Sequence, residues 1–348
     1  MTRELKQAAQ SRTTSSAAAK IVGAVVIAMV LGLVGLGWWC RLQLEAMAAT
    51  GEPVIVEVER GQGASAVARR LEAAGLVRSA PAFEIYLAYS GMGRRLKAGH
   101  FELSPTMSGP ELAAKIASGE VARRKLTVPE GLQLEQIAER VAEAGLAGAE
   151  EFLAAAVPES LVGEVSFEPP AESLEGYLLP ETYEFTFEAT PSDIVRRMAR
   201  ELDAQFVGPN AEAIAGSKLS LHEIITLASL VEREAKVAGD RPKIAGVLIN
   251  RLAQGMKLQC DATVQYALGE HKARLTFADL KVDSPYNTYL HAGLPPGPIA
   301  APGIASLRAA LRPAKTDALF YVARPDGSHV FTRTYEEHLA AIERIRGD

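Results

Sequence analysis

The longest uninterrupted run of apolar residues lies near the start of the chain. Residues 21–40, IVGAVVIAMVLGLVGLGWWC, contain no charged side chain, and about 20 apolar residues are what a helix needs to cross a bilayer. A cleaved signal peptide would have an apolar core of only ~7–15 residues, followed by a small-residue cleavage site. This run is longer and ends in Trp38 and Trp39, a residue type that favours the membrane–water interface. The pattern therefore predicts a transmembrane helix over residues 21–40.

Basic side chains are concentrated on one side of this segment. Those that precede it are Arg3, Lys6, Arg12 and Lys20. Arg41 and Glu45 follow it, and cytoplasmic flanks carry the excess of lysine and arginine. We therefore expect a single-pass protein of the inner (plasma) membrane, with residues 1–20 as a short disordered cytoplasmic tail and residues 41–52 as a linker. The rest of the chain would be periplasmic or extracytoplasmic.

A strand–turn–helix pattern occurs twice in the next part of the chain. Residues 56–76, VEVERGQGASAVARRLEAAGL, align without gaps with residues 126–146, LTVPEGLQLEQIAERVAEAGL. Each copy alternates apolar and polar residues, turns at a glycine, and continues with apolar residues at helical spacing up to a second glycine. The pattern resembles the LysM module, which binds glycans that contain N-acetylglucosamine. A plain strand–turn–helix that covers a core would have the same pattern, so both interpretations stand.

The remaining hydrophobic pattern predicts a mixed α+β fold. A strand, a Ser/Pro loop and a helix are expected within residues 96–120, and a strand pair within residues 318–334, with its turn at Pro325-Asp326-Gly327. Helices are expected at residues 133–145, 148–157, 191–207, 221–236, 240–254, 303–312 and 335–346. We therefore expect a small LysM-like α/β module at residues 53–125 and a larger α+β domain at residues 126–348.

Composition excludes several classes of function. The net charge is −5 and the isoelectric point is near 5.8, whereas a nucleic-acid-binding domain is usually strongly basic. Cys40 and Cys260 stand far apart, outside any CxxC or Cys/His cluster, so no disulfide framework or zinc site is expected. We expect no metal, no organic cofactor and no nucleic-acid partner.

Two glutamates at the end of one predicted helix are the candidates for chemistry. Ser220 and Glu223 form a capping-box pattern that fixes the start of this helix. At 100° per residue, Glu232 and Glu234 fall on the two edges of the apolar stripe, and Arg233 points away from it. Burial at such an edge raises a carboxyl pKa and keeps the group protonated as a general acid. Periodicity does not choose between the two, and both could be solvated residues of an ordinary amphipathic helix.

Five further motifs, taken together, resemble one family. They are EGYLLPETYEF (residues 175–185), LASLVEREAKVAGDRPKIAGVLINRL (227–252), GMKLQCDATVQYALG (255–269), SPYNTYLHAGLPPGPIAAPGIASL (284–307) and HVFTRTYEEH (329–338). In this order and spacing they resemble the membrane-anchored endolytic murein transglycosylases, or YceG-like family. The resemblance covers almost the whole chain, including the anchor. One departure is Ala262, where the family usually has proline between the aspartate and the threonine.

The resemblance implies a bacterial lytic transglycosylase, a lyase of cell-wall biogenesis. It would cut the β-1,4 bond between N-acetylmuramic acid and N-acetylglucosamine within nascent glycan strands, leave 1,6-anhydro ends and terminate strand elongation. The family's catalytic residue is the second glutamate of its helix motif, here Glu234. Glu232 is then a structural carboxylate or the alternative acid. Residues 126–348 would form the transglycosylase catalytic domain, with a lysozyme-like helical site.

Polar loops around this helix supply candidates for substrate binding, since such residues hydrogen-bond sugar hydroxyls. They are Gln259, Asp261, Thr263, Tyr286, Asn287, Thr288 and Tyr289. Tyr177, Glu181 and Tyr183 are either further contacts or a structural brace. Peptidoglycan glycan strands are the expected partner, and peptidoglycan synthases or division proteins are candidate protein partners.

Two other functions remain open at this point. If Asp261 lay opposite Glu234, the paired carboxylates would fit a lysozyme-like muramidase. A non-catalytic peptidoglycan-binding scaffold of the division or elongation machinery is the other alternative.

Overall fold

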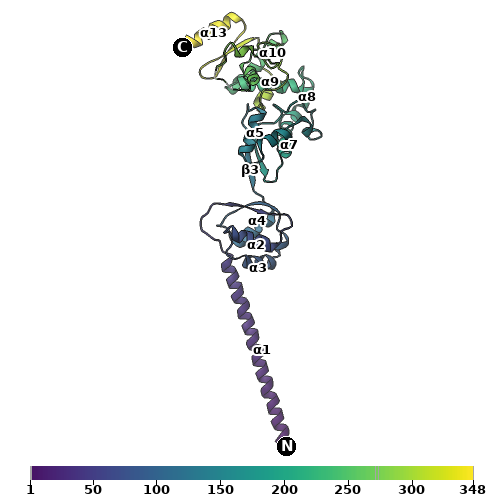
Figure 1. Cartoon of the computed structure of the whole chain (residues 1–348), viewed down its shortest axis with the longest axis vertical. Coiled ribbons are helices and arrows are strands. Elements are labelled where there is room, and N and C mark those ends of the chain that lie inside the picture. The colour runs from purple at the N-terminus through teal and green to yellow at the C-terminus, as the bar shows by residue number, and fades with distance from the viewer. Residues whose placement is uncertain (1, 271, 273, 348) are drawn as a thin grey trace. The chain divides into compact units, whose positions relative to one another are not determined.

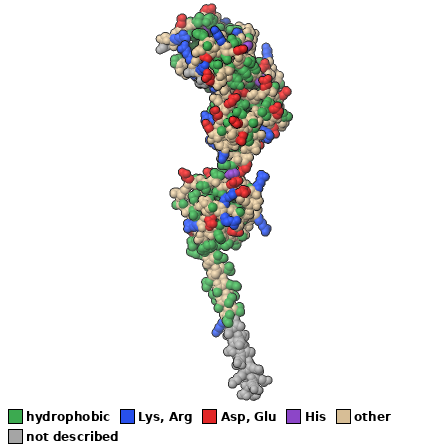
Figure 2. All heavy atoms as spheres, in the orientation of Figure 1, with side chains coloured by type: hydrophobic (Ala, Val, Ile, Leu, Met, Phe, Trp, Pro, Cys, Tyr) green, Lys and Arg blue, Asp and Glu red, His purple; other side chains and the backbone are tan. Residues whose placement is uncertain are grey.

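The computed structural model describes residues 2–270, 272 and 274–347, with side chains from Lys20 onward. Helix α1 (Thr2–Gln43) begins the chain, and its segment Lys20–Gln43 is long and apolar enough to cross a membrane. Hydrophobic side chains cover the visible face of this segment (Figure 2). The helix also continues through the tail that we expected to be disordered. Those residues are rich in alanine, the strongest helix former, which accounts for the difference.

The chain divides into two compact units, Met1–Arg123 and Arg124–Asp348. In the first unit, β1 (Val54–Val58) pairs antiparallel with β2 (Gly99–Leu103), and α2 (Ala64–Ala73) and α3 (Ala80–Tyr89) lie between them in the chain. A short 3-10 helix (Met92–Arg94) precedes β2, and α4 (Gly109–Ser118) follows it. The inward side chains of the strands pack on the helices in one core. Its strand residues are Val56, Val58, Phe101 and Leu103.

The repeated sequence pattern corresponds to repeated structure. β3 (Arg123–Thr127) and α5 (Leu134–Glu143) repeat the strand and helix of β1 and α2. The paired turn glycines, Gly61 and Gly131, have φ angles of +83° and +79°, a left-handed conformation that glycine adopts without strain. The same backbone shape is therefore formed twice.

The second copy extends further than the aligned residues. After α5, the chain continues through α6 (Ala149–Ala155) and a 3-10 helix (Pro158–Leu161) to β4 (Thr182–Thr186), which pairs with β3. Each unit thus contains a strand–helix–helix–strand arrangement. The return strand β4 lies in the EGYLLPETYEF motif, whose Gly and Pro residues predict a loop. It forms a strand because its alternate residues Tyr183 and Phe185 pack in the core of the second unit.

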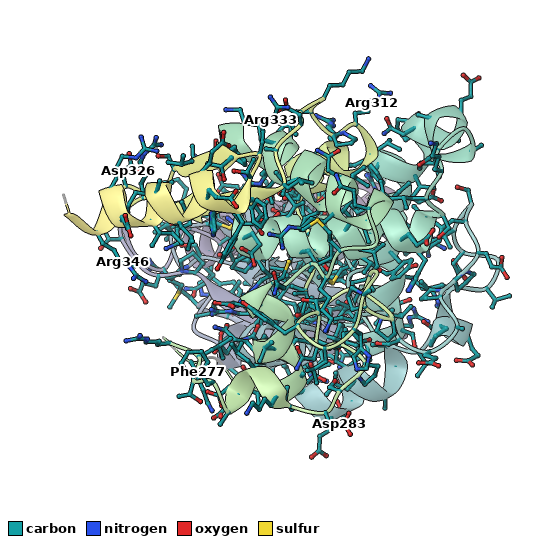
Figure 3. All side chains as sticks on the ribbon, turned by 90° about the horizontal axis from the view of Figure 1, so that it is seen from above. Phe277, Asp283, Arg312, Asp326, Arg333 and Arg346 are labelled. Carbon is teal, nitrogen blue, oxygen red and sulfur yellow. The ribbon has the colours of Figure 1, made fainter. Side chains whose placement is uncertain are left out.

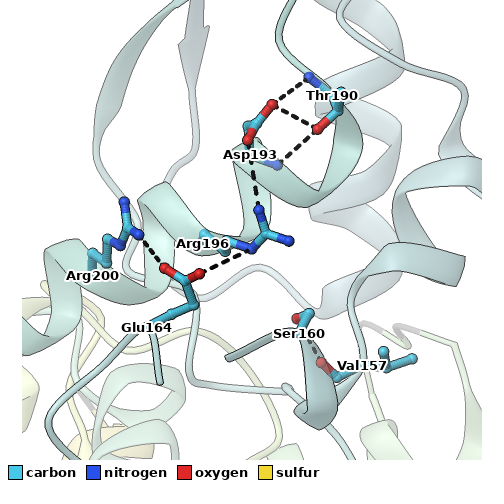
Figure 4. A network of polar contacts seen from close by, with 7 residues as sticks. All are labelled: Val157, Ser160, Glu164, Thr190, Asp193, Arg196 and Arg200. Atoms are coloured by element: carbon cyan, nitrogen blue, oxygen red, sulfur yellow. Dashed lines mark hydrogen bonds and ion pairs between the residues drawn. The ribbon is translucent and has the colours of Figure 1, made fainter. Parts of the chain in front are cut away.

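Helix α7 (Pro191–Leu202) is anchored by polar contacts at its start and along one side (Figure 4). Thr190 caps it, because its side chain accepts a hydrogen bond from the Asp193 backbone and its own N–H donates to the Asp193 carboxylate. Glu164, in the segment before β4, forms an ion pair with Arg200 on α7. The helix continues as a π-helical turn, Asp203–Val207, which completes the predicted helix at residues 191–207.

A buried helix, α9 (Leu221–Glu234), forms the centre of the second unit. α10 (Arg241–Ala253), which lies beside it in Figure 1, α11 (Asp261–Leu268) and α12 (Ile304–Leu311) all pack against it. Eight consecutive residues, 224–231, are buried, so apolar and small polar side chains face protein on every side. The sequence pattern predicted only one buried stripe. The other sides of α9 are buried as well because segments distant in sequence cover them, and a local pattern does not show such contacts.

Helix α11 was not predicted. Its sequence, DATVQYAL, has a weak apolar stripe, and we interpreted this region as a mixed loop. Gly269, with a φ of +68°, ends the helix. Ala262 lies in its first turn, where a proline of the family pattern is tolerated because first-turn N–H groups have no partner within the helix.

The C-terminal hairpin and helix agree with the predicted order. β5 (Phe320–Ala323) pairs antiparallel with β6 (His329–Thr332), and α13 (Tyr335–Gly347) follows. The side chains of Asp326 in the hairpin turn and Arg346 in α13 are exposed and point outward (Figure 3). The described part of the chain is therefore a mixed α+β protein, as expected.

Gly176 and Gly163 offer a matched test of packing in the second unit. Both have a left-handed backbone, with φ of +78° and +75°. An added Cβ would clash with the side chain of Pro298 at Gly176, whereas at Gly163 it would meet no atom within 4 Å. We expect Gly163→Ala to cost about 1 kcal/mol for the backbone alone, and Gly176→Ala about 1–3 kcal/mol more for the clash. Urea unfolding of the two variants measures the difference, and equal losses would contradict the crowding at Gly176.

Candidate active site

The capping box of α9 fixes the orientation of the two candidate glutamates. The Ser220 hydroxyl accepts from the backbone of Glu223 at 3.2 Å, and the Glu223 carboxylate accepts from the backbone of Ser220 at 2.8 Å. From this start the helix runs to its last residue, Glu234, after which Ala235 adopts an extended conformation. Glu232 and Glu234 therefore lie in the final turn and diverge from each other.

Glu232 is committed to contacts within the protein. One carboxylate oxygen lies 3.1 Å from Arg241 of α10, and the other accepts the Gly303 N–H at the start of α12 at 3.0 Å. Its side chain is only 6% exposed. Arg233, between the two glutamates, donates to the carbonyl of Gly131 at 3.0 Å. Glu232 thus fastens α9 to two neighbouring helices.

Glu234 lies in a different environment. It is partly buried next to Cys260, Asp261 and Tyr321. Burial, reinforced by the negative charge of Asp261, raises its pKa from 4.5 to about 7, although the Tyr321 hydroxyl and the guanidinium groups of Arg233 and Arg251 act in the opposite direction. A substantial fraction of Glu234 is therefore protonated near neutral pH, as a general acid requires.

Asp261 is the second carboxylate of the site. It begins α11, is exposed to solvent, and accepts a hydrogen bond from the hydroxyl of Tyr289. Asp261 and Glu234 interact electrostatically, so the structure brings together the two carboxylates that the muramidase alternative requires. Tyr289 is held beside them.

Gln259 has an unusual backbone conformation. Among the described residues it is the only one other than glycine with a positive φ, at +54°. Its N–H donates to the carbonyl of Thr288 at 3.2 Å, and its side chain is exposed next to Cys260. Strained residues of this kind gather at functional sites, where the surrounding structure compensates for their cost. The strain is consistent with a role for Gln259 at the site.

Three of the other candidate residues lie inside the protein. Thr263 and Thr288 are buried, and their hydroxyls are 2.9 Å apart. Asn287 is fully buried and donates to the carbonyls of Leu280 and Val282. The contact between Thr263 and Thr288 joins the start of α11, next to Gln259 and Asp261, to the loop of Tyr289, and the bonds of Asn287 close that loop.

The tyrosine candidates other than Tyr289 also have structural contacts. Tyr286 packs against Tyr266 with ring centroids 4.8 Å apart and lines a separate cleft near the start of α9. Tyr177 and Tyr183 are buried and bonded to His222 and to the Leu179 carbonyl, respectively. Both tyrosines fit the brace interpretation.

Arg251 is a site residue that the sequence analysis missed. It is 8% exposed, and it donates to the Leu319 carbonyl at 2.6 Å and to the Leu258 carbonyl at 2.7 Å. It therefore joins the segment before Cys260 to the segment before Tyr321 and holds both beside Glu234. A lone arginine within the apolar run VLINRL of a predicted helix was the available signal.

Tyr321 is positioned in turn by the hairpin. Its ring meets that of His329 edge-on, with centroids 5.6 Å apart. His329 is held by Asp240, whose carboxylate accepts from the His329 backbone at 2.8 Å and lies 3.2 Å from Nδ1. This contact connects the hairpin to the segment that follows α9. Among the described residues, no cluster of three or more His, Cys, Asp or Glu could hold a metal ion.

Comparison with known proteins gives the family. The model of the YceG-like family matches residues 56–344, most of the chain. The chain belongs to the YceG-like family. An endolytic murein transglycosylase of Bacillus subtilis is 37% identical over 305 residues, which cover 84% of each chain. One from Streptococcus pneumoniae is 32% identical over 82% of this chain and 57% of its own length.

A solved structure supports the same assignment. The crystal structure of a yceG-like protein from Listeria monocytogenes matches with a TM-score of 0.57 and 37% identity, over 84% of this chain and all of the other. The family resemblance drawn from the motifs is therefore confirmed. The α+β fold of this YceG-like chain also has a counterpart among known structures.

The raised pKa of Glu234 predicts a pH-dependent stability difference. Between its ordinary pKa of 4.5 and its folded pKa of about 7, the folded chain binds more protons than the unfolded chain, so this group destabilises the fold as pH rises. Glu234→Gln removes the effect. Its melting temperature should rise relative to the wild type between pH 4 and pH 8, as measured by circular dichroism.

Glu232→Gln is the matched control for that measurement. It weakens the contact with Arg241, so it should melt below the wild type at neutral pH. If the difference in melting temperature between Glu234→Gln and the wild type stayed constant across the pH range, the raised pKa assigned to Glu234 would be wrong.

Arg251 offers a second test. Arg251→Lys keeps the charge, but one ammonium group cannot reproduce the planar fork that reaches two carbonyls. We expect a loss of about 2–4 kcal/mol in the free energy of unfolding, because buried carbonyls lose their donors. Arg308→Lys, at an exposed position of α12, should change the stability by less than about 0.5 kcal/mol. Similar urea midpoints for both variants would show that Arg251 does not hold the site.

Proposed function

We propose that this protein is an endolytic murein transglycosylase, an enzyme that cuts peptidoglycan glycan strands internally. The observation that carries the proposal is the partly buried Glu234, with its pKa near 7, at the end of α9 in a chain 37% identical to an enzyme of that name. The bond cut is the β-1,4 linkage from N-acetylmuramic acid to N-acetylglucosamine.

Glu234 performs both proton transfers in this mechanism. It first protonates the glycosidic oxygen, so the bond from C1 to that oxygen breaks and the N-acetylglucosamine end leaves as an alcohol. The resulting carboxylate then takes the proton of the muramoyl C6 hydroxyl, whose oxygen bonds to C1 and closes the 1,6-anhydro ring. The acid is regenerated and no water is consumed. A pKa near the working pH serves both steps, because the group must give and take a proton.

Asp261 assists without acting as a nucleophile. Its negative charge raises the pKa of Glu234, and in this mechanism it stabilises the positive charge that develops at C1. A retaining muramidase would instead use this second carboxylate to form a covalent intermediate. The exposed side chains of Gln259 and Asp261, together with Tyr289, are our candidates for contacts with the glycan.

The first unit and α1 give this enzyme its location. The strand–helix–helix–strand arrangement of β1, α2, α3 and β2 supports a LysM-like role for residues 53–125, namely glycan binding next to residues 126–348. We propose that α1 anchors the chain in the inner membrane with its N-terminus in the cytoplasm and both units outside. From there it would cut nascent strands and so terminate their elongation, next to synthases or division proteins.

The products of digestion test the proposal. Purified wall is incubated with the full chain in detergent micelles, and the released fragments are analysed by mass spectrometry. We expect 1,6-anhydro ends from the wild type and a loss of about 10²–10⁴-fold in their rate of release with Glu234→Gln, because the general acid is removed.

The other outcomes identify the alternatives. Reducing ends in place of anhydro ends would make the protein a muramidase, and no product from the wild type would leave a scaffold. Glu232→Gln, where it remains folded, should still form anhydro ends. Full activity in Glu234→Gln together with none in Glu232→Gln would mean that Glu232 is the acid.

A further inference from the structure

A separate cleft lies near the start of α9, at the opposite end from Glu234. It encloses about 780 Å³, between the segment 166–177, the first residues of α9 and the segment 296–298. His222, in its wall, precedes Glu234 by twelve residues, which corresponds to about 18 Å along a helix. The cleft is thus too distant to serve the bond that is cut.

Aromatic rings form one wall of this cleft. The Tyr177 hydroxyl lies 2.8 Å from His222 Nδ1, and Nε2 of the same ring lies 2.7 Å from the Pro296 carbonyl. Because a carbonyl only accepts, Nε2 carries a proton, and Nδ1 accepts from the tyrosine in the neutral ring. Phe167 packs against Tyr177, with centroids 5.9 Å apart. These hydrogen bonds and ring contacts hold the aromatic side chains of the wall in one arrangement.

Glu175 supplies a buried carboxyl group among the residues that line the cleft. Its residue is 4% exposed, and one carboxyl oxygen accepts the N–H of Leu134 at 3.0 Å. The other oxygen, Oε1, is buried and has no hydrogen bond of good geometry among the described residues, although the N–H of Gly176 lies close enough to the carboxyl group to lower its pKa. Burial raises the pKa of Glu175 to about 7. An unpartnered buried oxygen is costly, and a ligand with a hydrogen-bond donor would satisfy it.

The charged residues of the cleft indicate which kind of hydrogen-bond donor such a ligand would carry. Glu168, Glu172 and Glu175 line it, and the described lining residues include no lysine or arginine. Acidic groups beside aromatic faces attract cations, whereas a neutral sugar would gain nothing from the surplus of negative charge. The lining therefore favours a cationic ligand.

We propose that this cleft binds a primary ammonium on an aliphatic side chain, such as the free amine of the diamino-acid residue in an uncross-linked stem peptide. The identity of the substrate rests on the proposed function. Cross-linking converts that amine into an amide and removes its charge, so the cleft distinguishes strands that are not yet cross-linked. Ionised Glu175 pairs with the ammonium, and the rings of Tyr177 and Phe167 cover the aliphatic chain.

A pair of synthetic peptides tests the charge requirement. Stem tripeptides that end in a diamino acid, with its side-chain amine either free or acetylated, are titrated calorimetrically into the full chain in detergent micelles. We expect acetylation to weaken binding about tenfold or more, the lower bound for a lost hydrogen bond to a charged group. Equal affinities would overturn the proposal, as would displacement of the free-amine peptide by an oligomer of N-acetylglucosamine, which would make the cleft a sugar subsite.

Glu175→Gln tests the residue itself. Glutamine can still accept from Leu134 but carries no charge, so the free-amine peptide should bind about tenfold more weakly while the acetylated one is unaffected. Glu139→Gln, on the exposed face of α5, should bind both peptides like the wild type. If Glu175→Gln does not fold, the double variant of the exposed Glu168 and Glu172 to glutamine serves instead and should also weaken the free-amine peptide. Unchanged affinity in the folded variant refutes the assignment.

The cleft proposal and the proposed function can be tested independently, because peptide binding and glycan cleavage are measured in separate experiments. Glu234→Gln should bind the free-amine peptide as the wild type does, since the two sites are far apart on α9. If the peptide binds as expected but the wild type cuts no glycan, the proposed function fails and the ammonium cleft stands. If glycan is cut and the free-amine peptide does not bind, the cleft proposal alone fails.

Discussion

The burial of α9 is the constraint on which the second unit depends. A helix with no solvent-facing side in its middle must satisfy every polar group within the protein. Ser229, which is fully buried, accepts the Ile299 N–H at 3.0 Å, and Glu232 accepts that of Gly303. Both contacts fix the loop that precedes α12 against the helix. A rigid rod results, with the proposed acid at one end and the aromatic cleft near the other.

The position of Glu234 on that rod adds to its acid character. The last carbonyls of a helix carry a partial negative charge, and a carboxylate at the C-terminal residue therefore meets an unfavourable field. This acts in the same direction as burial and as the charge of Asp261. The Tyr321 hydroxyl, Arg233 and Arg251 act in the opposite direction and keep the carboxyl group able to ionise, as the proposed second proton transfer requires.

Sequence alone predicted the local features well. The capping box of Ser220, the two glutamates near the apolar edge, the hairpin turn at Asp326 and the repeated strand–turn–helix depend on residues close together in the chain, and each is present. Roles that depend on distant partners could not be predicted. Glu232 meets Gly303, 71 residues away, and Arg251 meets Leu319, 68 residues away.

The same reason explains the candidates that lie inside the protein. Thr263, Asn287 and Thr288 have the polar chemistry of ligand contacts, but their hydrogen bonds close a loop instead. The sequence shows that such polar groups are present, but it does not show whether they face the protein interior or the solvent. Choosing Glu234 over Glu232 needed the family pattern, and the structure supplies the physical difference between the two environments.

The two turns of the repeated strand–turn–helix have different surroundings. An added Cβ at Gly61, in the first copy, would meet no atom within 4 Å, whereas at Gly131, in the second, it would touch Glu232 and Arg233. The first turn is thus constrained only by its own left-handed backbone, whereas the second also borders the end of α9, where both glutamates lie. A side chain added at the first turn would therefore disturb that turn alone, whereas one added at the second would also disturb the end of α9 that carries the two glutamates.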